Sequence, residues 1–215
     1  MGELAERLSE IVGQCSRYLS ERDEARERAL KKSRDIIREA GRLVTLIVSG
    51  DAEKAGRTLP RLEAMVREYL EALKPYPELY YSGSTYNAVS EYVEAAILYR
   101  LVSGEALPGP EDLSVPPVPY LQGLGDVVGE LRRLALDMLR RGDLEGAWRM
   151  LEYMEDIYLA LRSLDYPDSL LPGVRRKTDI ARRLVDETKA LLLDVAVREE
   201  LSRKIDEALR RLGGG

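Results

Sequence analysis

The stretch AVSEYVEAAILY, residues 88–99, is one of the most apolar of the chain, yet it contains two acidic residues, Glu91 and Glu94. In an α-helix, residues three apart lie on the same face, so the two carboxylates would be neighbours. A helix that is apolar on almost every other side is expected to be buried. Carboxylates are rarely buried without a partner, because removing a charge from water is costly. The stretch therefore predicts a buried helix whose glutamate pair meets a cation, a basic side chain or a polar cavity.

The composition is that of a soluble globular protein. The 215 residues are 45% hydrophobic and 33% charged, with a net charge of -5, and no apolar run approaches the length of a membrane span. The N-terminus is acidic and amphipathic, which is unlike a secretory signal. The single cysteine, Cys15, excludes an intrachain disulfide and favours a reducing compartment. We therefore expect a cytoplasmic protein without a membrane partner.

The chain contains no histidine. This absence excludes Ser-His-Asp and Cys-His catalysis and the zinc sites that depend on histidine. Any metal ion must then be held by oxygen ligands, which favours Mg²⁺, Mn²⁺ or Ca²⁺. The negative net charge argues against a globally basic nucleic-acid-binding protein but leaves room for a local basic surface.

Hydrophobic spacing and turn residues predict an all-α bundle of about seven helices in a single domain, residues 1–215. No β-hairpin signal, phosphate-binding glycine loop or internal repeat is present. The helices are expected at about 4–18, 21–48, 51–73, 78–102, 119–141, 143–163 and 174–212, with an irregularity at 82–84, one break in the last helix and a loop at about 103–119. Gly50 and Gly142 are expected to end helices, Asp51 and Asp143 to cap the helices that follow, and residues 213–215 to form a frayed tail.

A second acidic pair, Asp126 and Glu130, falls four residues apart in the helix expected at 119–141. It belongs to a polar stripe opposite an apolar one, which is the pattern of an amphipathic helix with a solvated face. Glu91 and Glu94 likewise admit a solvated position or pairing with arginines. Alternatively, the four carboxylates converge from two consecutive helices. Oxygen clusters of that kind hold Mg²⁺ or Mn²⁺ and activate water for attack on phosphorus.

Basic residues gather at several places along the chain. Most are interleaved with acidic residues, so salt bridges along helix faces are the plainer interpretation. The group at residues 175–177 follows a Pro-Gly pair and begins a helix, where it could meet phosphate oxygens. The candidates for RNA contact are Lys31, Lys32 and Arg34 in the first half of the chain, and Arg175, Arg176 and Lys177 in the second.

Four stretches resemble one known family. The sequence SEYVEA at 90–95 resembles the Glu-Tyr-Val-Glu-Ala signature of translin-associated factor X, and PYLQGLGDVVGELRR at 119–133 is similar to that family's second conserved stretch. The segments VDETKALLLDVAVR at 185–198 and KSRDI at 32–36 are similar to the C-terminal half and the long early helix of the translin family. The long linker between the first two motifs is missing here.

This resemblance implies a seven-helix fold that assembles into a hollow hexameric or octameric shell. Translin itself binds single-stranded RNA and DNA. The factor-X members have a metal-dependent endoribonuclease site of acidic residues on the inner face of the shell. By motif position, those residues correspond to Glu91, Glu94, Asp126 and Glu130.

Because the acidic set is kept, the chain is more similar to the catalytic factor-X type than to translin. The resemblance implies a homo-oligomer that cuts single-stranded RNA with Mg²⁺ or Mn²⁺. Two alternatives stay open, namely a non-catalytic translin-like scaffold that binds RNA or DNA, and a structural bundle in which Glu91 and Glu94 form buried ion pairs.

Overall fold

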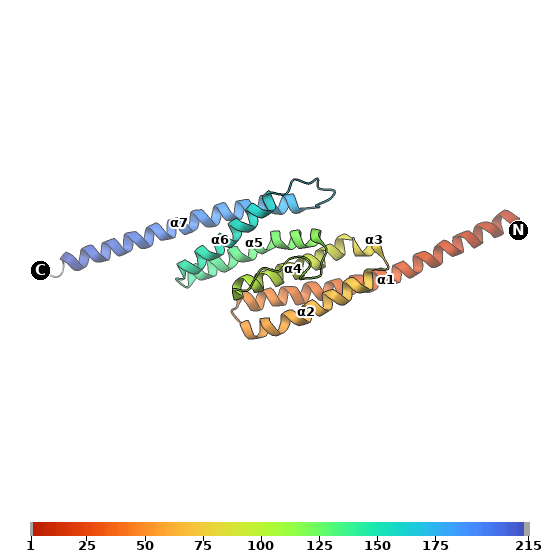
Figure 1. Ribbon diagram of the computed structural model, residues 1–215, viewed down its shortest axis with the longest axis horizontal. Helices are drawn as coiled ribbons and strands as arrows, with labels where there is room; N and C mark the ends of the chain where they lie inside the picture. Colours follow the sequence, from red (N-terminus) through yellow and green to blue (C-terminus); the bar gives the residue numbers. More distant parts are fainter. Residues whose placement is uncertain (1, 213–215) are drawn as a thin grey trace. The chain divides into compact units, whose positions relative to one another are not determined.

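The computed structural model describes residues 2–212 (Figure 1). Within this range the chain forms seven α-helices and no β-strand, which confirms the predicted all-α class and helix number. None of the helices in the described range combines the length and the apolar character that a membrane span requires. Residue 1 and residues 213–215, where the sequence predicts a frayed glycine tail, lie outside the described part.

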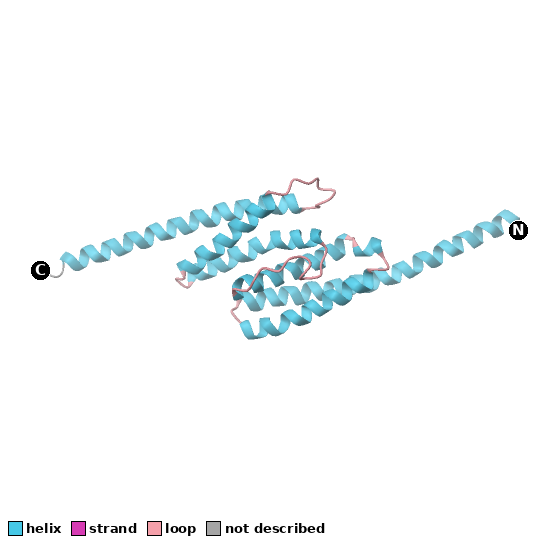
Figure 2. Ribbon diagram, viewed as in Figure 1, coloured by secondary structure: helices cyan, strands magenta, loops and turns pink. Residues whose placement is uncertain are grey.

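Short loops join most of the helices, and the loop at 104–116 is the longest connection (Figure 2). Most boundaries fall within a few residues of those predicted. The helices are α1 (Glu3–Val48), α2 (Ala52–Leu73), α3 (Pro77–Tyr80), α4 (Gly83–Ser103), α5 (Pro117–Arg140), α6 (Leu144–Arg162) and α7 (Val174–Leu212).

The sequence predicts three interruptions of helices, of which the structure corrects two and confirms one. The segments predicted at 4–18 and 21–48 are one continuous helix, because Leu19 and Ser20 between them include no glycine or proline to end it. For the same reason α7 runs without the expected break. The irregularity predicted near 82–84 is present, since the short helix α3 ends at Tyr80 and α4 begins at Gly83.

The helices fall into two compact units. One comprises residues 1–99 and 108–115, which include α1, α2, α3 and most of α4. The other comprises residues 100–107 and 116–215, which include α5, α6 and α7. The single domain expected from the sequence stays a prediction.

In the first unit, α1 packs against α2 through leucine and isoleucine side chains. Ile36 and Leu43 of α1 and Leu62 of α2 have at most 1% of their surface exposed. The buried hydroxyl of Tyr69 on α2 lies 2.9 Å from that of Thr85 on α4. Burying these apolar residues provides most of the driving force for packing. The hydrogen bond between the two hydroxyl groups gives each of them a partner in place of water.

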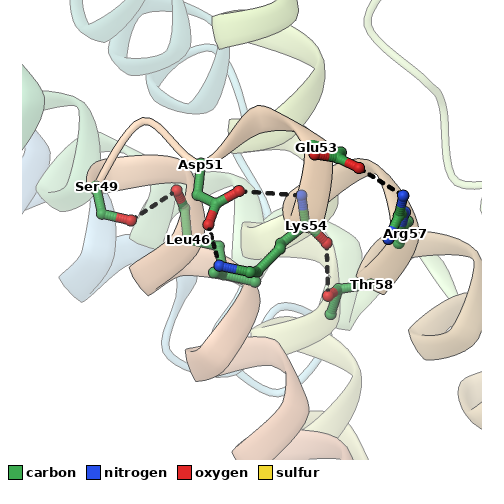
Figure 3. A network of polar contacts seen from close by, with 7 residues as sticks. All are labelled: Leu46, Ser49, Asp51, Glu53, Lys54, Arg57 and Thr58. Carbon is green, nitrogen blue, oxygen red and sulfur yellow. Dashed lines mark hydrogen bonds and ion pairs between the residues drawn. The ribbon is translucent and has the colours of Figure 1, made fainter.

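The turn between α1 and α2 is held by a local polar network (Figure 3). Gly50 adopts φ +79°, the left-handed conformation that glycine takes without a steric penalty. Asp51 caps α2 as predicted, because its carboxylate accepts the backbone N–H of Lys54 at 3.2 Å and the Lys54 ammonium at 2.7 Å. These two hydrogen bonds hold the pKa of Asp51 below its ordinary value.

Asp51 therefore predicts a pH-dependent contribution to stability. A lowered pKa means that the contribution is present above the unfolded-state pKa and is lost as the pH falls through the folded-state pKa. Asp51→Ala is expected to lower Tm near neutral pH, and its difference from wild type should shrink between about pH 5 and about pH 2. Asp51→Asn, which caps without a charge, is the control. A Tm difference for Asp51→Ala that stays constant over this range contradicts the assignment.

The second unit is formed by α5, α6 and α7. Its core includes Leu131 of α5, Leu151 and Met154 of α6, and Leu192 of α7, all of which have at most 1% of their surface exposed. Gly142, with φ +80°, ends α5, and Asp143 caps α6 by accepting the backbone N–H of Gly146 at 2.8 Å. Both roles were predicted from the Gly-Asp pair. In this unit, the first turns of α7 pack against one face of α5.

Candidate functional site

Helix α4 is buried on nearly every side, as predicted. Between residues 88 and 98, only Glu91 and Glu94 are partly exposed, and all the other side chains are buried. The spacing places both carboxylates on one face, one helical turn apart. The buried residues around them, Tyr92 and Val93 among them, fix the helix and therefore the direction in which the two carboxylates project.

Asp126 and Glu130 lie one turn apart on α5, in the second unit. Their side chains are 31% and 23% exposed, so this face of α5 is half-buried rather than fully solvated. Glu130 forms an ion pair with Arg133 at 3.5 Å. Further along the same stripe, hydrogen bonds from Arg140, together with the charge of Arg141, lower the pKa of Asp137. The two acidic pairs thus lie on two different helices, α4 in the first unit and α5 in the second.

Lys177 is a candidate for RNA contact that the structure brings to an acidic candidate from another helix. Its ammonium donates to both carboxylate oxygens of Asp126, across 51 positions of sequence. The sequence marked Lys177 as a candidate for RNA contact, but no pattern in it indicated this pairing. The packing of α7 on α5 creates the pair, and that packing is a tertiary feature.

Gly125 explains how α7 comes so close to α5. A Cβ atom at this position would lie 3.0 Å from Cβ and 3.4 Å from Cδ of Lys177. Such contacts are tighter than normal packing allows, so a larger residue here would push the lysine away. Gly129, one turn further along α5, is exposed and has open space around its Cα.

These two glycines predict opposite effects of the same substitution. Gly129→Ala should raise the free energy of unfolding by about 0.5–1 kcal/mol, because alanine favours the helix over glycine. Gly125→Ala should lower it by about 1 kcal/mol, since overpacking costs about 1–3 kcal/mol and outweighs that gain. Urea unfolding of both variants at one protein concentration measures the difference. Equal stabilisation by both would show that α7 does not press on Gly125.

The other basic candidates lie exposed on two helices. Lys31, Lys32 and Arg34 lie on α1, and Arg175 and Arg176 lie in the first turn of α7, after Gly173 with φ +75°. A helix N-terminus carries partial positive charge, which adds to that of the two arginines. A pocket of about 260 Å³ lies beside them, and sequence reasoning did not identify it. Its lining includes Arg162 and Arg175 together with Tyr166, Asp165 and Asp168.

The ligand chemistry of the candidate residues fits a hard divalent cation, because every donor is a carboxylate oxygen. Asp126 already binds a cation with both oxygens, namely the ammonium of Lys177. Within either unit of the described residues, however, no three Asp, Glu or Cys side chains gather around one potential metal position. The Mg²⁺ or Mn²⁺ requirement therefore stays a prediction.

Comparison with known proteins identifies the family. The sequence pattern of the Translin family matches residues 102–199, which contain Asp126, Glu130 and Lys177. An uncharacterized protein of Methanocaldococcus jannaschii is 31% identical over 192 residues, covering 86% of this chain and 85% of that protein. The chain belongs to the translin family.

Solved structures of translin-like proteins show the same fold. AfC3PO in complex with duplex RNA is 36% identical, with a TM-score of 0.81 over 87% of this chain and 97% of that one. Apo-NeC3PO is 25% identical, with a TM-score of 0.72 over 90% of this chain and 97% of that one. These matches confirm the translin-like fold expected from the sequence, and they leave the factor-X subtype as a prediction.

Proposed function

We propose that this translin-family protein is a metal-dependent endoribonuclease of the factor-X type. The observation that carries the proposal is the glutamate pair on α4, where Glu91 and Glu94 are the only partly exposed side chains of a buried stretch. Two carboxylates that project in a fixed direction from a buried helix are suited to bind a cation. Asp126 and Glu130 supply a second pair, and the resemblance in sequence assigns all four residues to one reaction.

In this proposal the chain's residues have separate tasks. Glu91, Glu94 and Asp126 would hold the cation, and Glu130 would hold it as well or orient the attacking water. Mg²⁺ or Mn²⁺, when bound, supplies an activated water and offsets the negative charge that develops on the phosphate. Because four carboxylates alone would repel a phosphate group, basic side chains must bind the rest of the RNA backbone.

RNA binding is supported by similarity to AfC3PO, which was solved with duplex RNA. We propose that this chain binds single-stranded RNA, with Arg175 and Arg176 among the contacts. Lys31, Lys32 and Arg34, which lie exposed on α1, are the second group of candidates. Single-stranded and duplex RNA should be compared directly.

The basic residues of α7 predict a specific loss of RNA affinity. Arg175→Ala with Arg176→Ala should weaken RNA binding about tenfold and reduce the dependence of the affinity on salt, because two phosphate contacts are removed. The matched control is Arg210→Ala with Arg211→Ala, an exposed arginine pair at the other end of the same helix. Fluorescence anisotropy at several salt concentrations measures both. Equal losses in the two double variants would exclude a local contact at the start of α7.

A homo-oligomer, hexameric or octameric, is part of the proposal. Exposed apolar residues are concentrated in the first part of α1 and the last part of α7, and groups of this kind mark protein interfaces. They are Leu4, Leu8, Ile11, Val12 and Leu19 on α1, and Leu193, Val197, Leu201, Ile205 and Leu209 on α7. Sedimentation measurements give the subunit number.

A non-catalytic translin-like scaffold is the second candidate. The observation that favours it is the ion pair of Asp126 with Lys177, which gives one of the four acids a structural partner. A circular single-stranded RNA separates the two functions, because only an internal cut converts it to a linear product. The endoribonuclease requires metal-dependent linearisation, whereas a scaffold binds the circle and leaves it intact.

A further inference from the structure

The pair formed by Lys177 and Asp126 differs from the other ion pairs on its helix. The lysine ammonium donates to both oxygens of the carboxylate, and the two side chains are only 26% and 31% exposed. Lys189, three turns further along α7, contacts a single oxygen of Glu155 at 2.9 Å, with 52% of its side chain exposed. Lys177 thus occupies both donor atoms of a proposed metal ligand, which Lys189 does not.

The backbone on both sides of this pair is fixed. Val174 at the start of α7 is 3% exposed, and the amide of Gln122 on α5 donates to the carbonyl oxygen of Pro172 at 2.7 Å. Gly125 leaves room for the stem of Lys177, because a Cβ atom there would lie 3.0 Å from that of the lysine. The Cα of Lys177 is therefore held beside Asp126, while its four-carbon side chain keeps rotatable bonds through which the ammonium can leave.

We propose that Lys177 is a displaceable counter-ion of Asp126, which competes with the divalent cation for the carboxylate and turns to the RNA backbone when the cation binds. The inference rests on the proposed function. An ammonium and a metal ion on the same two oxygens repel each other at short range, so binding of one disfavours binding of the other. Metal binding at Asp126 thus releases a positive charge near the site where a phosphate must bind.

This exchange couples metal binding to RNA binding. When RNA draws Lys177 away from Asp126, metal binding becomes stronger. Linkage requires that this factor equals the one by which metal strengthens RNA binding. A lysine that only stabilised the packing of α7 on α5 would produce no such coupling. Metal affinity therefore distinguishes a counter-ion from a structural ion pair.

The test is Mn²⁺ binding to the full chain, followed by the electron paramagnetic resonance signal of free Mn²⁺, without RNA. Lys177→Met is expected to bind Mn²⁺ about three- to tenfold more tightly than wild type, because the competing charge is gone. Lys177→Arg keeps the charge and should stay within about twofold of wild type. Lys189→Met removes the same charge from the same helix and should leave the affinity unchanged, whereas Asp126→Asn should weaken binding.

The outcomes separate this inference from the proposed function. If wild type binds Mn²⁺ and Lys177→Met binds it equally or more weakly, the counter-ion role is overturned while the metal site stands. Equal tightening in Lys177→Met and Lys189→Met also overturns it, because the effect would then reflect net charge alone. If neither wild type nor Lys177→Met binds Mn²⁺, the inference and the metal site of the proposed function are both overturned.

Discussion

Glu94→Gln is expected to lower the rate of metal-dependent RNA cleavage by at least about a hundredfold, because it removes a charged metal ligand with almost no change in shape. Glutamine keeps one carbonyl oxygen but binds a hard cation far more weakly than a carboxylate does. Glu94 is partly exposed, and the buried side chains on either side of it hold the helix in place. The variant should therefore keep the fold, the subunit number and the affinity for RNA. Cleavage of labelled single-stranded RNA, with sedimentation and anisotropy on the same samples, measures all three.

The matched control for this prediction is Glu68→Gln, which removes the same charge from an exposed position on α2. Its cleavage rate should be close to that of wild type. An unchanged rate in Glu94→Gln would remove Glu94 from the active site. A loss of cleavage accompanied by dissociation or unfolding would assign the glutamate to structure.

Leu151→Ala is expected to lower the free energy of unfolding by about 2–5 kcal/mol, the range for deleting a fully buried leucine side chain. Leu151 lies on α6 and is 1% exposed, in the core of the second unit. The loss combines the transfer free energy of the removed isopropyl group with the cost of the cavity that it leaves.

Leu159→Ala is the control, because Leu159 lies on the same helix and is 56% exposed. Its effect should stay within about 0.5 kcal/mol, as is usual for surface positions. Urea unfolding at one fixed protein concentration measures both variants, since association would add to the apparent stability. Similar losses for Leu151 and Leu159 would mean that the outer face of α6 is also buried, as it would be in an oligomer.

Local signals in the sequence account for most of the fold. Gly50-Asp51 and Gly142-Asp143 each combine a glycine suited to positive φ with a helix-capping aspartate, and both end one helix and begin the next where predicted. The length of α1 was underestimated because polar residues around Arg17 and Ser20 weaken the apolar pattern. That segment is largely exposed, so its helix needs no buried stripe there.

The candidate site was predictable only in part. The burial of α4 around Glu91 and Glu94 follows from composition, because nearly every neighbour in the stretch is apolar. The pairing of Lys177 with Asp126 was not predictable, because it depends on how α7 packs on α5 at Gly125. Helical periodicity places a residue on a face but does not say which other helix covers that face.

The proposed reaction is RNA cleavage by the carboxylates of this protein together with a divalent cation. The most direct test incubates one labelled single-stranded RNA with wild-type protein, first in Mg²⁺, then with EDTA, and then with Mn²⁺ in excess of the EDTA. RNA cleavage and RNA binding are recorded at each stage. The expected result is cleavage that stops with EDTA and resumes with Mn²⁺. RNA that is bound but stays intact at every stage would contradict it and establish the protein as a translin-like scaffold.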